Sequence, residues 1–396
     1  MQISKRAQDI QESPIRKLKP YEDEAAKRGI KVYHLNIGQP DIKTPEKFLD
    51  VYRNYDEKVL AYGPSGGLDN YRENLSNYYK KLGIDLCKEN IIITTAGSEA
   101  IIFALMVVCD HGDEIIIPEP FYTNYNGFSQ MAGVSVIPIE TKIENAYALP
   151  TDEQFKNVIT QKTKAIVICN PNNPTGAVYS KEELDRVVNI AQENNLYIIA
   201  DEVYREFVYD GLKHYSFLNF TDASENIIVV DSVSKRYSAC GARVGCIISK
   251  NKEIMASVMK FAQARLCPPT VDQLAANAVI DLEQDYFDEV IHEYTKRRDI
   301  VYEELSKIDG VICKKPEGAF YIMAKLPIED SEDFVVWLLK EFSVDNETVM
   351  FAPAGGFYAT PDLGKNEIRI AYVLNEADLR RAMEILRKGL EAYKNR

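Results

Sequence analysis

Long apolar stretches are missing from this sequence of 396 residues. No run approaches the roughly 20 consecutive apolar residues that a membrane-spanning helix requires. The N-terminal segment MQISKRAQDIQESPIRKLK has neither the apolar core nor the cleavage site of a signal peptide. The sequence therefore predicts a cytoplasmic protein with no membrane partner.

Positive charge is also scarce, because 47 Lys and Arg residues stand against 60 Asp and Glu residues and the formal net charge is −13. An acidic surface disfavours nonspecific binding to nucleic acid and anionic lipid. We therefore expect no nucleic-acid partner. A small anionic ligand is still compatible with this charge, since a few buried arginines can dominate a pocket.

Cysteine and histidine occur without a disulfide or metal-ligand pattern. The seven cysteines are odd in number, scattered, and form no C-x-x-C pair, and the four histidines are far apart. Scattered thiols in apolar stretches are typical of reduced cysteines in a cytosolic protein. We expect no metal site.

The residues that are present predict an α/β fold. Short β-branched runs alternate with helical patterns such as Ser98–Cys109 and Lys181–Glu193, and Ser180 to Glu183 form a capping box before the latter. We expect a mostly parallel seven-stranded sheet with helices on both faces. Its predicted strands are Ile91–Thr94, Glu114–Ile117, Val134–Ile137, Ala165–Cys169, Tyr197–Ala200, Ile227–Val230 and Val244–Ile248.

The pattern changes near Asp281, where a long charged helix begins. A smaller α+β domain is predicted beyond it, since 396 residues exceed what one core usually organises. We expect an N-terminal segment over 1–45 that packs on the small domain and a dimer partner, a large domain over 46–285 and a small domain over 286–396. The predicted elements of the small domain are the strands Ala319–Ala324 and Ile368–Val373 and the helices Glu332–Phe342 and Glu376–Tyr393.

Distinctive residues follow the carboxyl ends of the predicted strands, where open parallel sheets bind ligands. The turn Ala96-Gly97-Ser98 leads into a helix whose free N–H groups suit a phosphate, although an ordinary helix start is the alternative. The segment Asn170–Gly176, with the sequence NPNNPTG, makes a rigid turn that presents side-chain amides.

A carboxylate and an amine follow two further strands. Asp201 ends an apolar strand, which is costly unless the carboxylate meets a cation such as a protonated pyridine nitrogen; a helix N-cap is the alternative. Lys235 follows Ser232 and Ser234, and Arg243 comes eight positions later. Hydroxyls and a guanidinium can bind a phosphate and leave the amine free to attack an aldehyde. The alternative for a lone lysine is a solvated surface charge.

The segments Ser232–Gly245 and Asn170–Gly176 together resemble the signatures of class I/II aminotransferases of the fold-type I pyridoxal-phosphate superfamily, and the likeness covers nearly the whole chain. This resemblance implies pyridoxal 5′-phosphate as cofactor. It also implies transfer of an amino group from an L-amino acid to a 2-oxo acid such as 2-oxoglutarate.

The resemblance further implies roles for single residues. Lys235 would bind the cofactor covalently and Asp201 would pair with its pyridinium nitrogen, while Asn173 and Tyr204 would contact its phenolic oxygen and Tyr122 would stack on its ring. The residues that would hold the phosphate are Ala96, Gly97, Ser98, Ser232, Ser234 and Arg243.

On the substrate side, the resemblance implies that Arg369 grips the α-carboxylate, with Asn173 and a backbone contact at Gly38 nearby. Tyr62 resembles the tyrosine that reaches the neighbouring subunit's phosphate, which implies a homodimer with shared active sites. Arg265 resembles the arginine with which aspartate aminotransferases read a distal carboxylate from the other subunit, although an interface or surface salt bridge is the alternative.

We therefore expect aspartate or glutamate as the favoured donor. Aromatic amino acids or alanine are the alternative, as is another fold-type I activity such as a β-lyase. Arg369 argues against decarboxylation, because it would hold the group that must leave. A sensory domain of a transcription regulator would need a DNA-binding module and usually a basic surface, and we find neither.

Overall fold

A seven-stranded sheet forms the centre of the larger part of the molecule in the computed structural model, which describes residues 1–396. The strand order is β2-β8-β7-β6-β5-β3-β4, and only β8 runs antiparallel to its neighbours. The strands are β2 (Ile91–Thr95), β3 (Glu114–Glu119), β4 (Ser135–Glu140), β5 (Thr163–Cys169), β6 (Tyr197–Asp201), β7 (Ile227–Ser232) and β8 (Val244–Ile248). The predicted fold class is confirmed, and the bounds differ most at β4, which ends at Glu140 rather than Ile137.

Helices cover both faces of this sheet. Because side chains alternate along a strand, Ile92 enters one core while Ile91 and Ile93 enter the other. On the first face lie α5 (Ala96–Val108), α6 (Asn124–Ala132) and α10 (Lys252–Arg265). On the second lie α3 (Glu46–Arg53), α4 (Asp69–Lys81), α7 (Asp152–Val158), α8 (Lys181–Glu193) and α11 (Thr270–Ala278).

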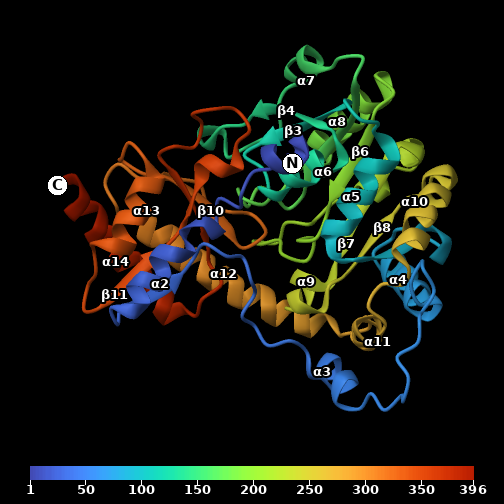
Figure 1. Ribbon diagram of the computed structural model, residues 1–396, viewed down its shortest axis with the longest axis horizontal. Helices are drawn as coiled ribbons and strands as arrows, with labels where there is room; N and C mark the ends of the chain where they lie inside the picture. The colour runs from blue at the N-terminus through green and yellow to red at the C-terminus, as the bar shows by residue number, and fades with distance from the viewer.

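The C-terminal part is built on a four-stranded antiparallel sheet of order β12-β13-β10-β9. Its strands are β9 (Ile312–Cys313), β10 (Tyr321–Lys325), β12 (Ala352–Pro353) and β13 (Glu367–Ala371), and its helices are α12 (Gln284–Ser306), α13 (Ser331–Lys340) and α14 (Glu376–Lys394). In Figure 1, α13 and α14 lie at the left, the large sheet lies at the right, and α12 runs between them.

The N-terminal segment packs on this C-terminal part. Strand β1 (Lys31–His34) pairs in parallel with β11 (Glu347–Met350), and α2 (Lys19–Lys27) contacts α13. Figure 1 shows α2, in blue, beside the orange and red elements. The domain boundaries after residues 45 and 285 stay a prediction.

Local capping sets several helix starts. Ser180 Oγ accepts the Glu183 backbone N–H at 3.2 Å, and the Glu183 carboxylate accepts the Ser180 backbone N–H at 2.9 Å, so the predicted capping box of α8 is confirmed. The remaining short helices are α1 (Lys5–Asp9) and α9 (Val233–Arg236), besides several single 3₁₀ turns. None of the helices combines the length and apolar character that crossing a bilayer requires.

Candidate functional site

A cavity of about 560 Å³ opens at the carboxyl ends of β5, β6 and β7, where it meets the C-terminal part. Most residues predicted from the sequence as ligand contacts line it, although they come from distant segments. The predicted residues in its lining are Gly38, Ala96, Gly97, Ser98, Tyr122, Asn173, Tyr204, Ser232, Ser234, Lys235, Arg243 and Arg369.

One end of the cavity is formed by the turn between β2 and α5, packed against the segment that precedes β8. Ala96 and Arg243 both have left-handed backbones, with φ of 63° and 55°, and the Ala96 N–H donates to the Arg243 carbonyl at 3.0 Å. Such conformations cost energy in non-glycine residues and gather at functional sites. A side chain at Gly245 would stand 2.5 Å from the Ala96 carbonyl carbon, so only glycine permits this approach.

This end presents donors to the cavity. The Ser232 hydroxyl lies 2.8 Å from that of Ser234, and Arg243 donates to the Cys240 carbonyl at 2.9 Å without any carboxylate partner. Gly97 and Ser98, in the first turn of α5, line the same end of the cavity, and N–H groups at this position have no partner within the helix. The two hydroxyl groups, the guanidinium and the N-terminus of α5, a helix of 13 residues, together make a site for a phosphate.

The Lys235 amine points into the middle of the cavity. It donates to the Gly38 carbonyl at 2.8 Å and lies 3.8 Å from the Cys240 sulfur. Burial lowers the pKa of Lys235, with Arg369 and Arg243 adding to the effect. A lowered pKa increases the neutral, nucleophilic fraction of the amine, so Lys235 is suited to attack a carbonyl group and is no solvated surface charge.

Asp201 lies just beneath the cavity, between the lining residues Cys169 and Val203. Its side chain is 4% exposed, accepts the Tyr125 hydroxyl at 2.7 Å and accepts the Val203 backbone N–H at 3.3 Å. Burial raises the pKa of Asp201 to about 6. A cation reaching this carboxylate would favour its ionised form. The alternative of a helix N-cap is wrong, because no helix begins directly after Asp201.

Arg369, on β13, is a buried cation without a carboxylate partner. It is 2% exposed and donates to the Asn36 carbonyl at 2.5 Å and to the Asn173 side-chain oxygen at 3.1 Å, while its Nε has no partner. Its guanidinium lies 4.5 Å from the centre of the Tyr321 ring and 4.8 Å from that of Phe357. Burial lowers the pKa of Arg369. Since an unpaired buried charge is costly, this site favours an anion from the cavity.

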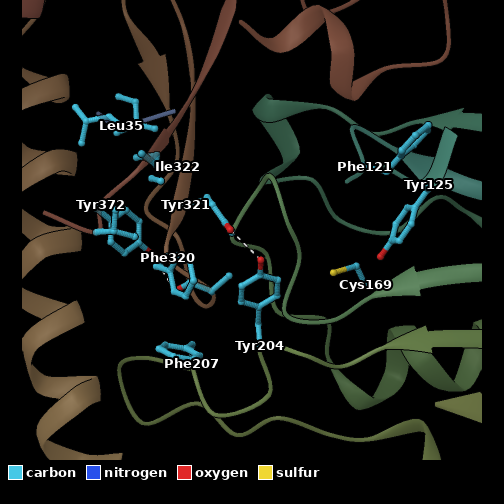
Figure 2. Packing of buried hydrophobic residues seen from close by; sticks show 14 of the residues in the cluster. Leu35, Phe121, Tyr125, Cys169, Tyr204, Phe207, Phe320, Tyr321, Ile322 and Tyr372 are labelled. Atoms are coloured by element: carbon cyan, nitrogen blue, oxygen red, sulfur yellow. Dashed lines mark hydrogen bonds between the residues drawn. The ribbon is translucent and has the colours of Figure 1, made fainter. Parts of the chain in front are cut away.

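Two tyrosines join the large sheet to the C-terminal part across the cavity. The hydroxyl groups of Tyr204, which follows β6, and Tyr321, on β10, lie 2.8 Å apart and point toward each other in Figure 2. Asn173 donates to the Tyr204 hydroxyl at 3.4 Å. A side chain at Gly38 would stand 1.8 Å from the Tyr321 hydroxyl, so glycine is required there.

Besides Asp201, two predicted residues, Tyr62 and Arg265, are not part of the cavity lining of their own chain. Tyr62 is 82% exposed. Arg265 forms an ion pair with Glu99 at 3.3 Å and donates to the Ile93 carbonyl at 3.0 Å, which agrees with the salt-bridge alternative within one subunit. Contacts of Tyr62 and Arg265 with another subunit's cavity stay a prediction.

Some lining residues escaped the sequence analysis. Arg16 and Ile15 reach the cavity from the N-terminal segment, Tyr321 from β10 and Cys240 from the turn after Lys235. Cys240 lies inside the lysine signature and its proximity could have been noticed there. Arg16 and Tyr321 carry no local pattern, because their approach depends on packing between distant segments.

Comparison with known proteins agrees with this geometry. The sequence pattern of the family "Aminotransferase class I and II" matches residues 30–386. The aspartate aminotransferase of Pyrococcus horikoshii is 33% identical, over 99% of this chain and 98% of its own. An aromatic-amino-acid aminotransferase of Thermococcus litoralis is 32% identical over 100% of both chains. The solved alanine aminotransferase from Pyrococcus furiosus superposes with a TM-score of 0.89 at 32% identity, over 99% of this chain and 100% of its own.

Proposed function

The chain belongs to the class I and II aminotransferases, and we propose that it uses pyridoxal 5′-phosphate, bound through Lys235, to move an amino group from aspartate or glutamate to a 2-oxo acid such as 2-oxoglutarate. The observation that carries this proposal is the joint presence, in one cavity, of a buried amine with a lowered pKa and a buried arginine without a carboxylate. An amino acid with its α-carboxylate on Arg369 would present its nitrogen on the Lys235 side of the cavity.

The cavity fits the proposed cofactor at three points. The hydroxyls of Ser232 and Ser234, with Arg243 and the N-terminus of α5, would take the phosphate. Asp201 would meet the pyridinium nitrogen, because its buried carboxylate lies under the cavity floor and has only neutral partners. The partly buried ring of Tyr122 is available for stacking.

The bound cofactor would supply an electron sink that makes the substrate Cα–H acidic. The other roles fall to residues of the chain. Asp201 holds a negative charge against the ring nitrogen, and Tyr204 and Asn173 lie where they can donate to the ring's oxygen. Once the substrate amine has replaced it on the cofactor, the Lys235 amine, with its lowered pKa, would carry a proton from Cα to the cofactor carbon.

Arg369 fixes the substrate for this proton transfer. Its planar guanidinium binds a carboxylate through two parallel hydrogen bonds. The aromatic rings of Tyr321 and Phe357 hold the guanidinium from its faces, so its orientation is set before substrate arrives. A carboxylate held there does not leave, which disfavours decarboxylation.

Overall sequence identity does not distinguish between the candidate amino donors. The relatives named for aspartate, aromatic amino acids and alanine are 33%, 32% and 32% identical to this chain. Aromatic donors or alanine are therefore the second candidate, and a β-lyase reaction is the third. The preference for aspartate or glutamate is supported by the positive charge of the cavity, to which Arg16, Lys235, Arg243 and Arg369 contribute.

We also propose a cytoplasmic homodimer with shared active sites. Tyr62 stands in a segment with two other exposed apolar side chains, Val59 at 74% and Leu60 at 65% exposure, and a partner subunit would cover this surface. All seven cysteines are free, as expected in a reducing compartment.

The function is tested with a panel of amino donors against 2-oxoglutarate, with pyruvate as a second acceptor. We expect transamination that depends on added cofactor and is fastest with aspartate or glutamate. A preference for phenylalanine or tyrosine would favour the aromatic alternative. Release of ammonia without any need for a 2-oxo acid would favour the lyase alternative.

A further inference from the structure

All charged side chains in the cavity lining are cationic. Four cationic side chains line it, those of Arg16, Lys235, Arg243 and Arg369, and no Asp or Glu residue is part of the lining. None of the four forms an ion pair with a carboxylate of the chain, in a protein whose net charge is −13. Such a cavity is built for more than one anionic group.

Three of these cations already have a ligand in the proposed function. Arg243 meets the phosphate, Lys235 the cofactor aldehyde and Arg369 the α-carboxylate. Arg16 is left without one. Arg16 is solvent-exposed and its guanidinium makes no hydrogen bond or ion pair within the chain, while its backbone N–H donates to Ser13 and its carbonyl accepts the Lys19 N–H.

The chain around Arg16 is nevertheless firmly packed. Pro14 is buried against Gly356, where a side chain would come within 2.4 Å of the proline ring, and Leu18 is 1% exposed. Ile15 packs on the cluster that contains Phe357, the same ring that lies 4.8 Å from the Arg369 guanidinium. These contacts hold the segment that carries Arg16 against the part of the molecule that contains Phe357, and Arg16 lines the same cavity as Arg369.

Tyr122 lines the same cavity as both arginines. Burial raises the pKa of Tyr122 to about 12 and Asp201 adds to the rise, while Arg369, Arg243 and Arg16 each oppose it. The charges of Arg16 and Arg369 therefore act on one hydroxyl group at the cavity wall. A ligand bound to Arg369 shares the cavity with a second guanidinium, that of Arg16.

On the basis of the proposed aminotransferase function, on which this assignment depends, we propose that Arg16 binds the distal carboxylate of a dicarboxylic amino acid or 2-oxo acid while Arg369 holds its α-carboxylate. Arg16 is thereby a specificity-determining residue supplied by the same chain. Arg265 does not line this cavity in its own subunit, where it forms an ion pair with Glu99 and donates to the Ile93 carbonyl.

The test compares Arg16→Ala with Lys17→Ala and Arg265→Leu in the cofactor-loaded protein. Lys17 is the matched control, because it is adjacent to Arg16 but forms an ion pair with Glu332 outside the cavity. Binding of maleate, an unreactive dicarboxylate, and of butyrate, a monocarboxylate, is measured by calorimetry. The kcat/KM values for aspartate and alanine are measured alongside.

Arg16→Ala should weaken maleate binding and lower kcat/KM for aspartate by about 10- to 100-fold, the loss typical of one hydrogen-bonded charge. Butyrate binding and kcat/KM for alanine should change by less than about 3-fold, as should every value for Lys17→Ala. Equal losses for aspartate and alanine, or a dicarboxylate-specific loss in Arg265→Leu alone, would overturn the role of Arg16. The absence of transamination with every donor in the wild-type protein would instead refute the proposed function.

Discussion

Replacing Arg369 by leucine separates the binding role of this arginine from a structural one. Arg369 is 2% exposed, and its Nη1 and Nη2 atoms donate only to the neutral acceptors Asn173 and Asn36. Breaking a buried charge pair with a substrate carboxylate costs on the order of 3–5 kcal/mol. At 1.36 kcal/mol per factor of ten, we expect kcat/KM for every donor to fall about 100- to 5,000-fold.

The stability of the same variant should change much less. Two acceptors lose their donor, which costs about 1–3 kcal/mol each, but a buried cation without a counter-anion is removed, which relieves several kcal/mol. These effects oppose each other, so the free energy of unfolding should stay within about 2 kcal/mol of the wild-type value. Urea unfolding without substrate measures it.

Arg298→Leu is the matched control. Arg298 is also fully buried, but it pairs with both oxygens of Asp210, at 2.8 and 2.9 Å, and lies outside the cavity. It should lose more stability than Arg369→Leu and keep most of its kcat/KM. If Arg369→Leu unfolds more easily than Arg298→Leu and retains near-normal kcat/KM, Arg369 is a structural arginine and the substrate assignment is wrong.

Three further predictions concern other residues of the site. Asp201→Asn should keep the hydrogen bond from Tyr125 and still bind cofactor. Its turnover rate should fall about 100-fold or more, because an amide carries no charge to stabilise the pyridinium. Near-normal turnover would make Asp201 a structural residue. Gly38→Ala should displace Tyr321, because the Tyr321 hydroxyl would lie 1.8 Å from the added carbon. The variant should lose activity and about 1–3 kcal/mol of stability, measured by thermal unfolding. An unchanged melting temperature would contradict this packing. Sedimentation at assay concentration should find a dimer, in which the exposed Tyr62 of each subunit completes the active site of the other. A fully active monomer would exclude shared active sites.

Much of the fold could be predicted because the large sheet is covered on both faces. Its strands are continuous apolar runs, as in Ala165–Cys169, and each ends in a polar motif. The Lys235 segment could be assigned because its pattern is local. Ser232 and Ser234 contact each other, and Arg243, eight positions after Lys235, lines the same cavity.

The parts that could not be predicted depend on long-range packing. Arg16 is more than 300 positions from Arg369, and they share a cavity because the N-terminal segment packs on the C-terminal part, where Ile15 contacts the cluster that contains Phe357. Tyr321 belongs to a strand that reads as ordinary core, and nothing local indicates that its hydroxyl faces Tyr204. Arg265 resembles a reader of a distal carboxylate by its place in the sequence, which carries no information on its contact with Glu99.

The most direct test of the central claim is a single-turnover experiment with the cofactor-loaded protein and aspartate, without any 2-oxo acid. We predict one oxaloacetate per active site and then no further release until 2-oxoglutarate is added, because the amino group stays on the enzyme until an acceptor removes it. Lys235→Ala should release none, since it lacks the amine that moves the proton. Continuous release without an acceptor, or an equal burst from Lys235→Ala, would contradict an aminotransferase that works through Lys235.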